Sequence, residues 1–512
     1  MKINQLKAGA LLSYIYMGLG YLVSIIYTPI MLRLLGQSEY GLYSLATSIV
    51  SFLGVLNFGF GSTYTHYYLQ YKVQDDKDKI ATLNGMFLII FSFIGVIAVM
   101  AGTIIIINAD IIIGDKLSLS ELSKIKILMF ILVINLAFTF PNIVFTSHIT
   151  ANEKFVFQKL LQIVQLVANP FVILPVLLMG YSSIGMVIAT TVLNLFIEII
   201  NIKYCLKRLK MKFLFNNFDF KLMKEMTIFS SYIFLNLVID QINWNVDKLL
   251  IGRFHGTVSV AVYGVASQLN NYYMMISTAI SSVFIPRVHR IVASSNDNKA
   301  LTELFIKIGR LQFIILSLIS TGLIFFGRPF INMWAGYNYD DSYKIVLILI
   351  LSESISLIQN IGIEIQQAKN MHRFRSFVYF LIALVNIIIS IPLTKLYKGI
   401  GAAFGTALGI IIGNGLIMNL YYYFKVGINI KLFWKQIIIL SKALIIPVFA
   451  GLLINRFVNL YNILNFLCFG IIYVIIFCIS MWFLGINQYE KDLFQKPIIK
   501  AISWIKNNIL TF

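Results

Sequence analysis

One segment of the chain carries a regular series of polar residues inside an otherwise apolar stretch. Asn236, Asp240, Asn243 and Asp247 follow one another at intervals of four, three and four residues. At about 100° per residue, this spacing keeps all four side chains on one face of an α-helix. Amides donate and accept hydrogen bonds, and carboxylates bind protons or cations. This face is therefore a candidate hydrated binding surface.

Two further segments repeat the pattern. The first contains Glu353, Asn360, Glu364 and Gln367, and the second contains Gln268, Asn271, Thr278 and Ser282. A water-filled cavity shared by the three stripes would satisfy these side chains. The alternative is that Asp240 and Glu353 are buried structural hydrogen-bonding groups. A smaller set, Glu198 with Asn194 and Asn201, lies at the end of another apolar run, and there we expect a structural role.

Motifs for enzyme chemistry are missing from the sequence. The five histidines lack HxxxH or HExxH spacing, and the three cysteines form no metal-binding pattern. There is no GxxxxGK[ST] loop and no GxSxG elbow. We therefore predict no metal site, no cofactor and no enzymatic activity.

The composition shows what surrounds the polar stripes. Of the 512 residues, 59% are hydrophobic and only 12% are charged, about half the charged fraction of a soluble domain. So few polar side chains cannot cover a water-exposed surface of this size. We therefore predict an integral membrane protein.

The apolar runs are long enough to be membrane helices, each needing about 20 residues. Their continuous hydrophobicity excludes the alternating pattern of barrel strands. We predict an all-α fold with about fourteen spans, at residues 9–31, 41–69, 84–107, 127–150, 157–179, 184–202, 227–252, 261–285, 311–334, 345–367, 376–394, 399–424, 437–455 and 463–485.

A membrane setting makes the intramembrane carboxylates costly. On insertion scales, a carboxylate at the bilayer centre costs roughly 2.5 to 3.5 kcal/mol. Asp240 and Glu353 both fall near the middle of their predicted spans. Each therefore needs a partner or a hydrated environment.

The distribution of basic residues predicts the orientation. With the N-terminus inside, cytoplasmic segments hold 29 of the 41 Lys and Arg residues, and the opposite side holds 10. This excess places both termini in the cytoplasm. The net charge of +20 is therefore explained by topology, and we expect no nucleic-acid partner.

A long loop rich in basic residues, at 203–226, suggests how the predicted spans are grouped. We predict two six-helix lobes, pseudo-symmetric parallel repeats that begin on the same side of the membrane. A cytoplasmic linker joins them, and two peripheral helices and a cytoplasmic tail follow. The boundaries are residues 1–202 and 227–424 for the lobes, 203–226 for the linker, 425–485 for the peripheral helices and 486–512 for the tail.

Four motifs in this order resemble the Wzx-type polysaccharide transporters, which are bacterial flippases for polysaccharide repeat units. They are LLGQSEYGLYS at 34–44 with NFGFG at 57–61, VDKLLIGRF at 246–254 with VYGVASQL at 262–269, QQAKNMHRFR at 366–375 and GIGAAFGT at 399–406. The resemblance spans most of the chain. The same superfamily contains multidrug antiporters and the lipid II flippase.

This resemblance implies that two lobes rock around a central cavity, in the bacterial cytoplasmic membrane, while the last two helices pack outside. The implied substrate is an undecaprenyl-diphosphate-linked oligosaccharide, whose prenyl tail stays in membrane lipid. Other membrane proteins of polysaccharide assembly are possible partners. Three roles are implied for individual residues. Sugar-binding candidates are Asn236, Asn243, Asn271, Asn360 and Gln268; ion-coupling candidates are Asp240, Asp247 and Glu353; phosphate-binding candidates are Arg33, Lys248 and Arg253.

A cation-coupled multidrug antiporter of the same superfamily is the alternative. The deepest charged groups on the predicted polar faces are acidic, which suits organic cations better than a diphosphate. The basic candidates lie toward the outer ends of their spans. The motifs favour the flippase, whereas the acidic stripes favour the antiporter.

Overall fold

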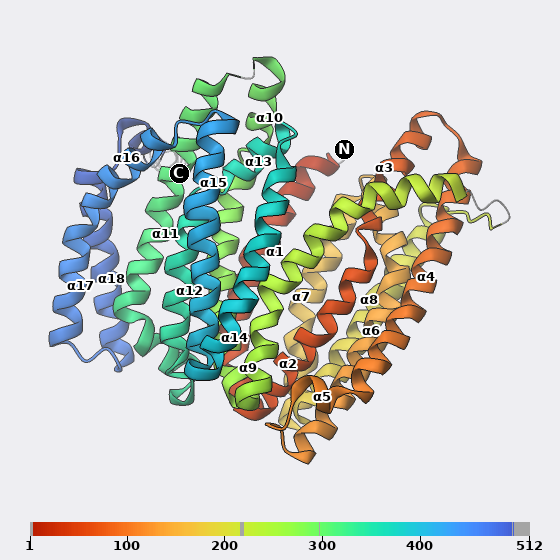
Figure 1. Ribbon diagram of the computed structural model, residues 1–512, viewed down its shortest axis with the longest axis horizontal. Helices are drawn as coiled ribbons and strands as arrows, with labels where there is room; N and C mark the ends of the chain where they lie inside the picture. Colours follow the sequence, from red (N-terminus) through yellow and green to blue (C-terminus); the bar gives the residue numbers. More distant parts are fainter. Residues whose placement is uncertain (1–3, 216–219, 296, 494, 496–512) are drawn as a thin grey trace, which may run out of the picture. The chain divides into compact units, whose positions relative to one another are not determined.

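The computed structural model describes residues 4–215, 220–295, 297–493 and 495 (Figure 1). Across these residues the chain forms helices and no strand, which confirms the all-α prediction. Residues 216–219 of the predicted linker lie outside the described residues. So do residue 494 and residues 496–512 of the predicted tail.

The helices follow one another with short connections. In the first half they are α1 (Gln5–Leu35), α2 (Gln37–Leu53), α3 (Phe60–Val73), α4 (Lys77–Ile107), α5 (Ala109–Ile113), α6 (Leu119–Ala151), α7 (Phe155–Leu178) and α8 (Ser182–Lys207). Next come α9 (Phe220–Ser282), α10 (Ile285–Ser294), α11 (Asn298–Trp334), α12 (Ser342–Leu357), α13 (Ile361–Ala368) and α14 (His372–Ile410). The last are α15 (Met418–Tyr421), α16 (Ile430–Ser441), α17 (Ile445–Phe457) and α18 (Ile463–Ser480).

Twelve helical stretches in the described part of the chain are long and apolar enough to cross a membrane. Two of them, Ile233–Ser282 and Arg373–Val426, are 50 and 54 residues long, about twice the length that one span needs. Each has a non-helical break, at Gly256 in the first and at Tyr397 and Lys398 in the second. These breaks fall between pairs of predicted spans, so the arrangement agrees with fourteen crossings.

The second predicted span breaks where the sequence has three glycines close together. Helix α2 passes into a 3-10 turn at Gly54–Asn57, and Phe58 and Gly59 take left-handed conformations before α3 begins. The Asn57 side chain accepts a hydrogen bond from the Gly59 N–H at 2.7 Å and stabilises this turn. The glycine cluster therefore marks a fixed bend in the span.

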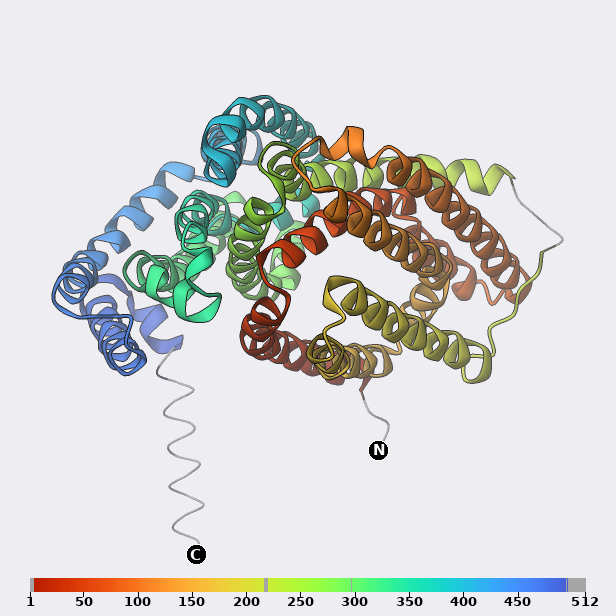
Figure 2. The same cartoon turned by 90° about the horizontal axis from the view of Figure 1, so that it is seen from below.

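The chain divides into two compact units by internal contacts. Unit 1 comprises residues 1–265 and 383–405, and unit 2 comprises residues 266–382 and 406–512. Within unit 1, α4 packs on α6, α6 on α8, and α1 on α7 (Figure 1 and Figure 2). Within unit 2, α11 packs on α12, α16, α17 and α18.

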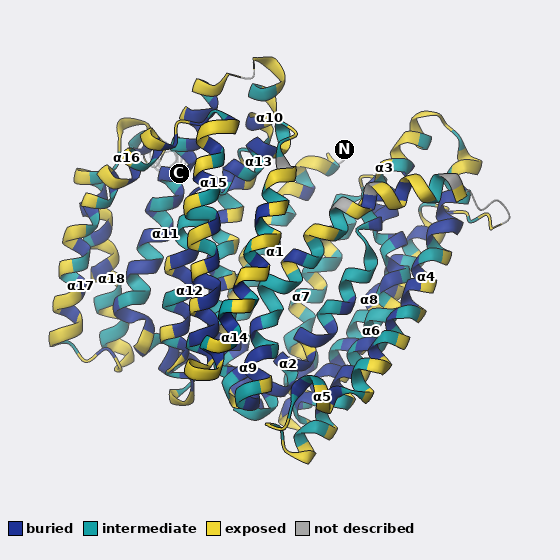
Figure 3. Cartoon of the chain, viewed as in Figure 1, coloured by how far each residue is buried: buried dark blue, intermediate teal, exposed yellow. Residues whose placement is uncertain are grey.

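The outward faces of many helices are apolar. Large hydrophobic side chains along α1, α4, α17 and α18 are exposed, and exposed and buried positions alternate along the ribbons (Figure 3). An exposed apolar surface of this extent is expected where lipid is the solvent. Two glycines of α14 lie very close to the part of this helix that precedes the break at Lys398. A Cβ at Gly401 would lie 2.0 Å from the Leu393 carbonyl oxygen, and one at Gly405 would lie 2.1 Å from the Ser390 hydroxyl.

Candidate functional site

The polar stripe on α9 becomes more buried from its first residue to its last. Asn236 and Asp240 are exposed, Asn243 is half-buried and Asp247 is buried. The Tyr263 hydroxyl donates a hydrogen bond to Oδ2 of Asp247 at 2.5 Å. Tyr263 follows the break at Gly256, so the returning part of α9 supplies this donor. Of the acidic residues on the stripe, Asp247 is therefore buried and hydrogen-bonded, whereas Asp240 is exposed.

The three phosphate-binding candidates have different surroundings. Arg33 is exposed near the end of α1, and Lys248 is half-buried. Arg253 is exposed and donates from Nη1 to the carbonyl oxygens of Ile111 and Ile112 at 3.0 and 3.1 Å. These carbonyls end the short helix α5, where a cation is favoured. Arg253 is thus held by backbone in this conformation.

In unit 2, two of the predicted sugar-binding residues bond to neighbouring side chains. Gln268 donates to the Tyr272 hydroxyl at 2.6 Å, and Asn360 donates to the Ser277 hydroxyl at 3.4 Å. Gln312, which is fully buried, also donates to Ser277 at 3.1 Å. The structure therefore places Asn360 within a polar network between α9, α11 and the α12–α13 turn. Asn271 is exposed on α9.

Glu353 is buried in α12, with 6% of its surface exposed. Within the described residues, no hydrogen bond or ion pair reaches its carboxylate. The next residue, Ser354, bonds to the Tyr273 hydroxyl at 2.6 Å. Glu353 is therefore a buried carboxylate without a protein partner among the described residues, and its role in ion coupling stays a prediction.

A polar cavity of about 260 Å³ lies in unit 1 between α6, α7 and α8. We call it the α6–α8 cavity. Each of the three helices contributes three polar residues, namely Thr139, Asn142 and Thr146, then Gln158, Gln162 and Gln165, and then Asn194, Glu198 and Asn201. The sequence analysis singled out only the last set. The other two share its spacing of three and four residues, and this signal could have revealed the cavity.

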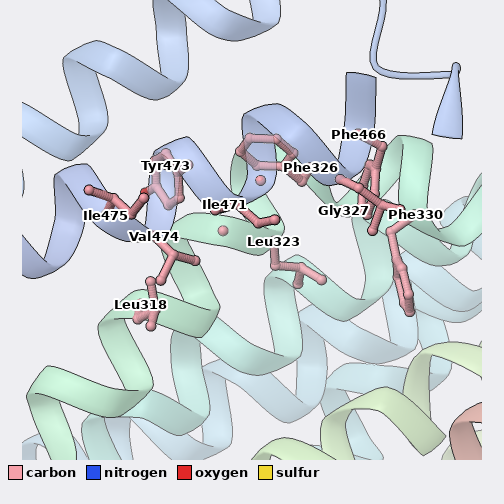
Figure 4. Close-up of a pocket in the computed structure, with 13 residues that line it drawn as sticks. Leu318, Leu323, Phe326, Gly327, Phe330, Phe466, Ile471, Tyr473, Val474 and Ile475 are labelled. Carbon is pink, nitrogen blue, oxygen red and sulfur yellow. The ribbon is translucent and has the colours of Figure 1, made fainter. Parts of the chain in front are cut away.

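The groove in Figure 4 contrasts with this cavity. It lies in unit 2 between α11 and α18 and has a volume of about 470 Å³. Its lining is apolar apart from the Tyr473 hydroxyl, and includes Leu318, Leu323, Phe326, Phe330, Phe466, Ile471 and Val474. Such a lining suits hydrocarbon and has no group that could orient a sugar or a phosphate.

At the end of α6 predicted to be outside the cell, Glu121 joins three elements of unit 1. Its Oε1 accepts hydrogen bonds from Ser38 at 2.8 Å and from Thr257 at 2.7 Å, and its Oε2 accepts from the Ser118 N–H at 3.0 Å. Burial acts to raise the pKa of Glu121, but these hydrogen bonds together outweigh it and lower the pKa. Nearby, Lys124 pairs with Glu39.

The profile of the family described as "Polysaccharide biosynthesis protein" matches residues 30–344. A Shigella flexneri protein named "Putative O-antigen transporter" is 21% identical over 397 residues, covering 76% of this chain and 91% of that protein. Among solved structures, the lipid II flippase MurJ in an inward closed conformation has a TM-score of 0.74 at 18% identity. That alignment covers 96% of this chain and 99% of MurJ.

A second solved structure is an inward-facing multidrug resistance transporter of the MATE family, in the MOP superfamily. Its TM-score is 0.63 at 12% identity, covering 80% of this chain and 95% of that one. At these identities, the two structures establish a shared fold, and the fold is common to flippases and drug transporters.

Proposed function

The chain belongs to the polysaccharide biosynthesis protein family, and on that premise we propose that it is a flippase for an undecaprenyl-diphosphate-linked oligosaccharide. The family match over residues 30–344 carries this proposal. The Shigella relative named for O-antigen transport and the fold shared with the lipid II flippase support it. Because all these named neighbours are transporters, the chain is a transporter and not an enzyme.

Such a substrate needs a protein to cross the membrane. A diphosphate and a hydroxyl-rich glycan lose their hydration in hydrocarbon, which is costly for each charge and each unpaired hydroxyl. A hydrated route removes that barrier. The prenyl tail is itself apolar and can remain in lipid.

We place the protein in the bacterial cytoplasmic membrane with both termini in the cytoplasm, based on the basic-residue bias. We propose residues 1–202 and 227–424 as the two lobes that move during alternating access, with residues 203–226 as the linker. Within the second of these ranges, residues 227–265 and 383–405 have their internal contacts with unit 1. Residues 425–485 form the peripheral pair of helices. Membrane proteins that extend or attach the glycan are plausible partners because they would use its product.

The residue roles follow from the chemistry of each side chain. Asn236, Asn243, Asn271, Asn360 and Gln268 bind sugar hydroxyls, and Arg33, Lys248 and Arg253 meet the diphosphate during part of the cycle. For ion coupling, the buried and uncompensated carboxylate of Glu353 is the strongest candidate. Asp240, which is exposed, is second. Asp247 is third, because it already accepts a hydrogen bond from Tyr263.

A multidrug antiporter is the second candidate function. The observation that favours it is the acidic character of the intramembrane charges, Asp240, Asp247 and Glu353. Cation efflux and glycan export can be separated in one experiment. Host cells are depleted of the protein, and lipid-linked glycans, surface polysaccharide and sensitivity to cationic drugs are measured together.

We expect an undecaprenyl-diphosphate oligosaccharide to accumulate on the cytoplasmic side while surface polysaccharide falls. Unchanged glycans with increased drug sensitivity would reject the flippase and support the antiporter. The coupling role is tested by Glu353→Gln and Asp240→Asn, each at wild-type expression, with the exposed Asp341→Asn as the matched control. Export at the wild-type rate in both variants would contradict coupling through these carboxylates.

A further inference from the structure

The α6–α8 cavity contains a carboxylate that the protein itself does not neutralise. We propose that this cavity binds a monovalent cation, with Glu198 supplying the negative charge. The site is formed by α6, α7 and α8, whereas the coupling candidates are on α9 and α12. It goes beyond the proposed function, because the cavity would bind the ion whatever substrate the protein carries.

The Glu198 side chain is buried and has one hydrogen-bonding partner among the described residues. Only 8% of the Glu198 surface is exposed. Its one hydrogen bond within the described residues comes from the Thr139 hydroxyl to Oε1 at 2.8 Å, and no ion pair involves it there. One neutral donor cannot compensate a carboxylate removed from water. A cation bound in the cavity would supply the missing charge; a proton on Glu198 is the alternative, and the ion titration below separates the two.

Two glutamine amides at the cavity direct their nitrogen atoms toward neighbouring side chains. Gln165 donates from its amide nitrogen to Asn194 at 2.8 Å, and Gln158 donates to the Thr150 hydroxyl at 3.1 Å. Each glutamine thus uses its nitrogen on a neighbour, and in the described structure its oxygen has no hydrogen bond. Oδ1 of Asn142 is buried and also has no partner. Carbonyl oxygens without a hydrogen bond, such as these three, are ligands that hard cations prefer.

The charged neighbour on α7 does not fill this role. Lys159 bonds to the Gln162 side chain at 3.0 Å and lies over the Tyr16 ring, with its nitrogen 5.6 Å from the ring centre. Lys159 thus contacts a residue of the cavity lining, Gln162. Among the described residues it forms no ion pair with Glu198. Lys159 therefore leaves the cavity open to an external cation.

The single carboxylate indicates the charge of the ion. Multivalent cations are usually bound by several carboxylates, whereas the nine polar residues of this lining include only Glu198. The described residues also hold no group of three or more His, Cys, Asp or Glu side chains suited to a metal. A volume of about 260 Å³ exceeds what one bare ion needs, since a water molecule occupies about 30 Å³ in the liquid. The ion therefore keeps several waters.

The test measures ion binding on the purified full-length protein in lipid nanodiscs, without any glycan. The thermal unfolding midpoint is followed as NaCl, KCl or LiCl replaces choline chloride at constant ionic strength. Binding to the folded state should raise the midpoint in a saturable way for at least one of these alkali cations. Lack of a saturable rise with all three would overturn the proposal.

Two variants locate the site. Glu198→Gln keeps the shape and removes the charge, and we expect its apparent affinity to fall at least tenfold. Asn142→Leu removes the unpartnered oxygen and should weaken binding severalfold, and it tests the site independently if Glu198→Gln fails to fold. Glu153→Gln, in the exposed turn between α6 and α7, is the matched control and should bind like the wild type.

An unchanged ion response in both Glu198→Gln and Asn142→Leu would refute this site. Because the assay contains no glycan, that failure would leave the flippase proposal intact. Conversely, a flippase proposal rejected by unchanged cellular glycans would leave the ion binding measurable.

Discussion

Glu198 and Glu490 are both buried carboxylates, but the protein treats them in opposite ways. Glu490, after α18, is 1% exposed and accepts two hydrogen bonds from Arg310 on α11, at 2.6 Å from Nε and 2.8 Å from Nη2. Arg310 also donates to the Gly485 carbonyl at 3.0 Å. Among the residues that the structure describes, Glu198 accepts a hydrogen bond only from the Thr139 hydroxyl.

This difference separates a structural role from a functional one. The bidentate pair in unit 2 is complete, so it ties the segment after α18 to α11 without any ligand. The carboxylate in unit 1 lacks its countercharge and lies in a cavity that has room for one. Burial alone therefore does not identify a site; burial without compensation does.

The largest effect on stability is expected when Arg310 is replaced. In Arg310→Met, the Glu490 carboxylate stays buried without its partner, which should cost about 3 to 5 kcal/mol. The thermal unfolding midpoint in nanodiscs should fall strongly. Arg456→Met, at an exposed position on α17, is the control. A double variant with Glu490→Gln should recover most of the loss, and a midpoint unchanged in Arg310→Met would contradict a structural pair.

A smaller effect is expected at Asp247, whose carboxylate has a neutral donor. Tyr263→Phe removes the 2.5 Å hydrogen bond, and bonds to charged groups contribute about 1.5 to 3 kcal/mol. The unfolding midpoint should fall, but less than in Arg310→Met. Tyr337→Phe changes an exposed tyrosine and should leave the midpoint as it is. Equal midpoints for the two tyrosine variants would show that this bond does not stabilise the fold.

Glu121 extends the comparison to a carboxylate at the membrane surface. In the folded protein the pKa of Glu121 is below its usual value of 4.5. The ionised Glu121 therefore stabilises the fold to its full extent at pH values above 4.5. That contribution is lost as the pH falls through the folded pKa. As the pH falls from about 5 to about 3, Glu121→Gln should therefore lose less stability than the wild type. An identical pH profile for both proteins would exclude this linkage.

The smallest effect is expected when Glu198 loses its charge in the absence of alkali cations. In choline buffer, Glu198→Gln should match or slightly exceed the wild-type unfolding midpoint, because an uncompensated buried charge contributes little or is unfavourable. The Asp341→Asn variant is the reference for a change at an exposed site. A large fall in the midpoint of Glu198→Gln would mean that the protein already compensates this carboxylate.

Membrane spans and their order could be predicted from the sequence because hydrocarbon acts on every residue of a span. About 20 apolar residues in a row can be recognised without knowing their neighbours. The bend near Phe58 likewise depends on residues that are close together in the sequence, Gly54 and Gly59. By contrast, α9 and α14 each join two predicted spans. Where one span ends and the next begins depends on the non-helical breaks at Gly256 and Lys398.

From the sequence alone we could predict the solvent of this protein, its helical class, the order of its apolar spans and the family motifs. Which polar residues form a site was decided only by tertiary structure. Arg310 and Glu490 are 180 positions apart, and the α6–α8 cavity combines three helices, each with a stripe that alone looks like ordinary helix contacts. The physical reason is that charge compensation is a property of the neighbours in space, and only folding brings those neighbours together.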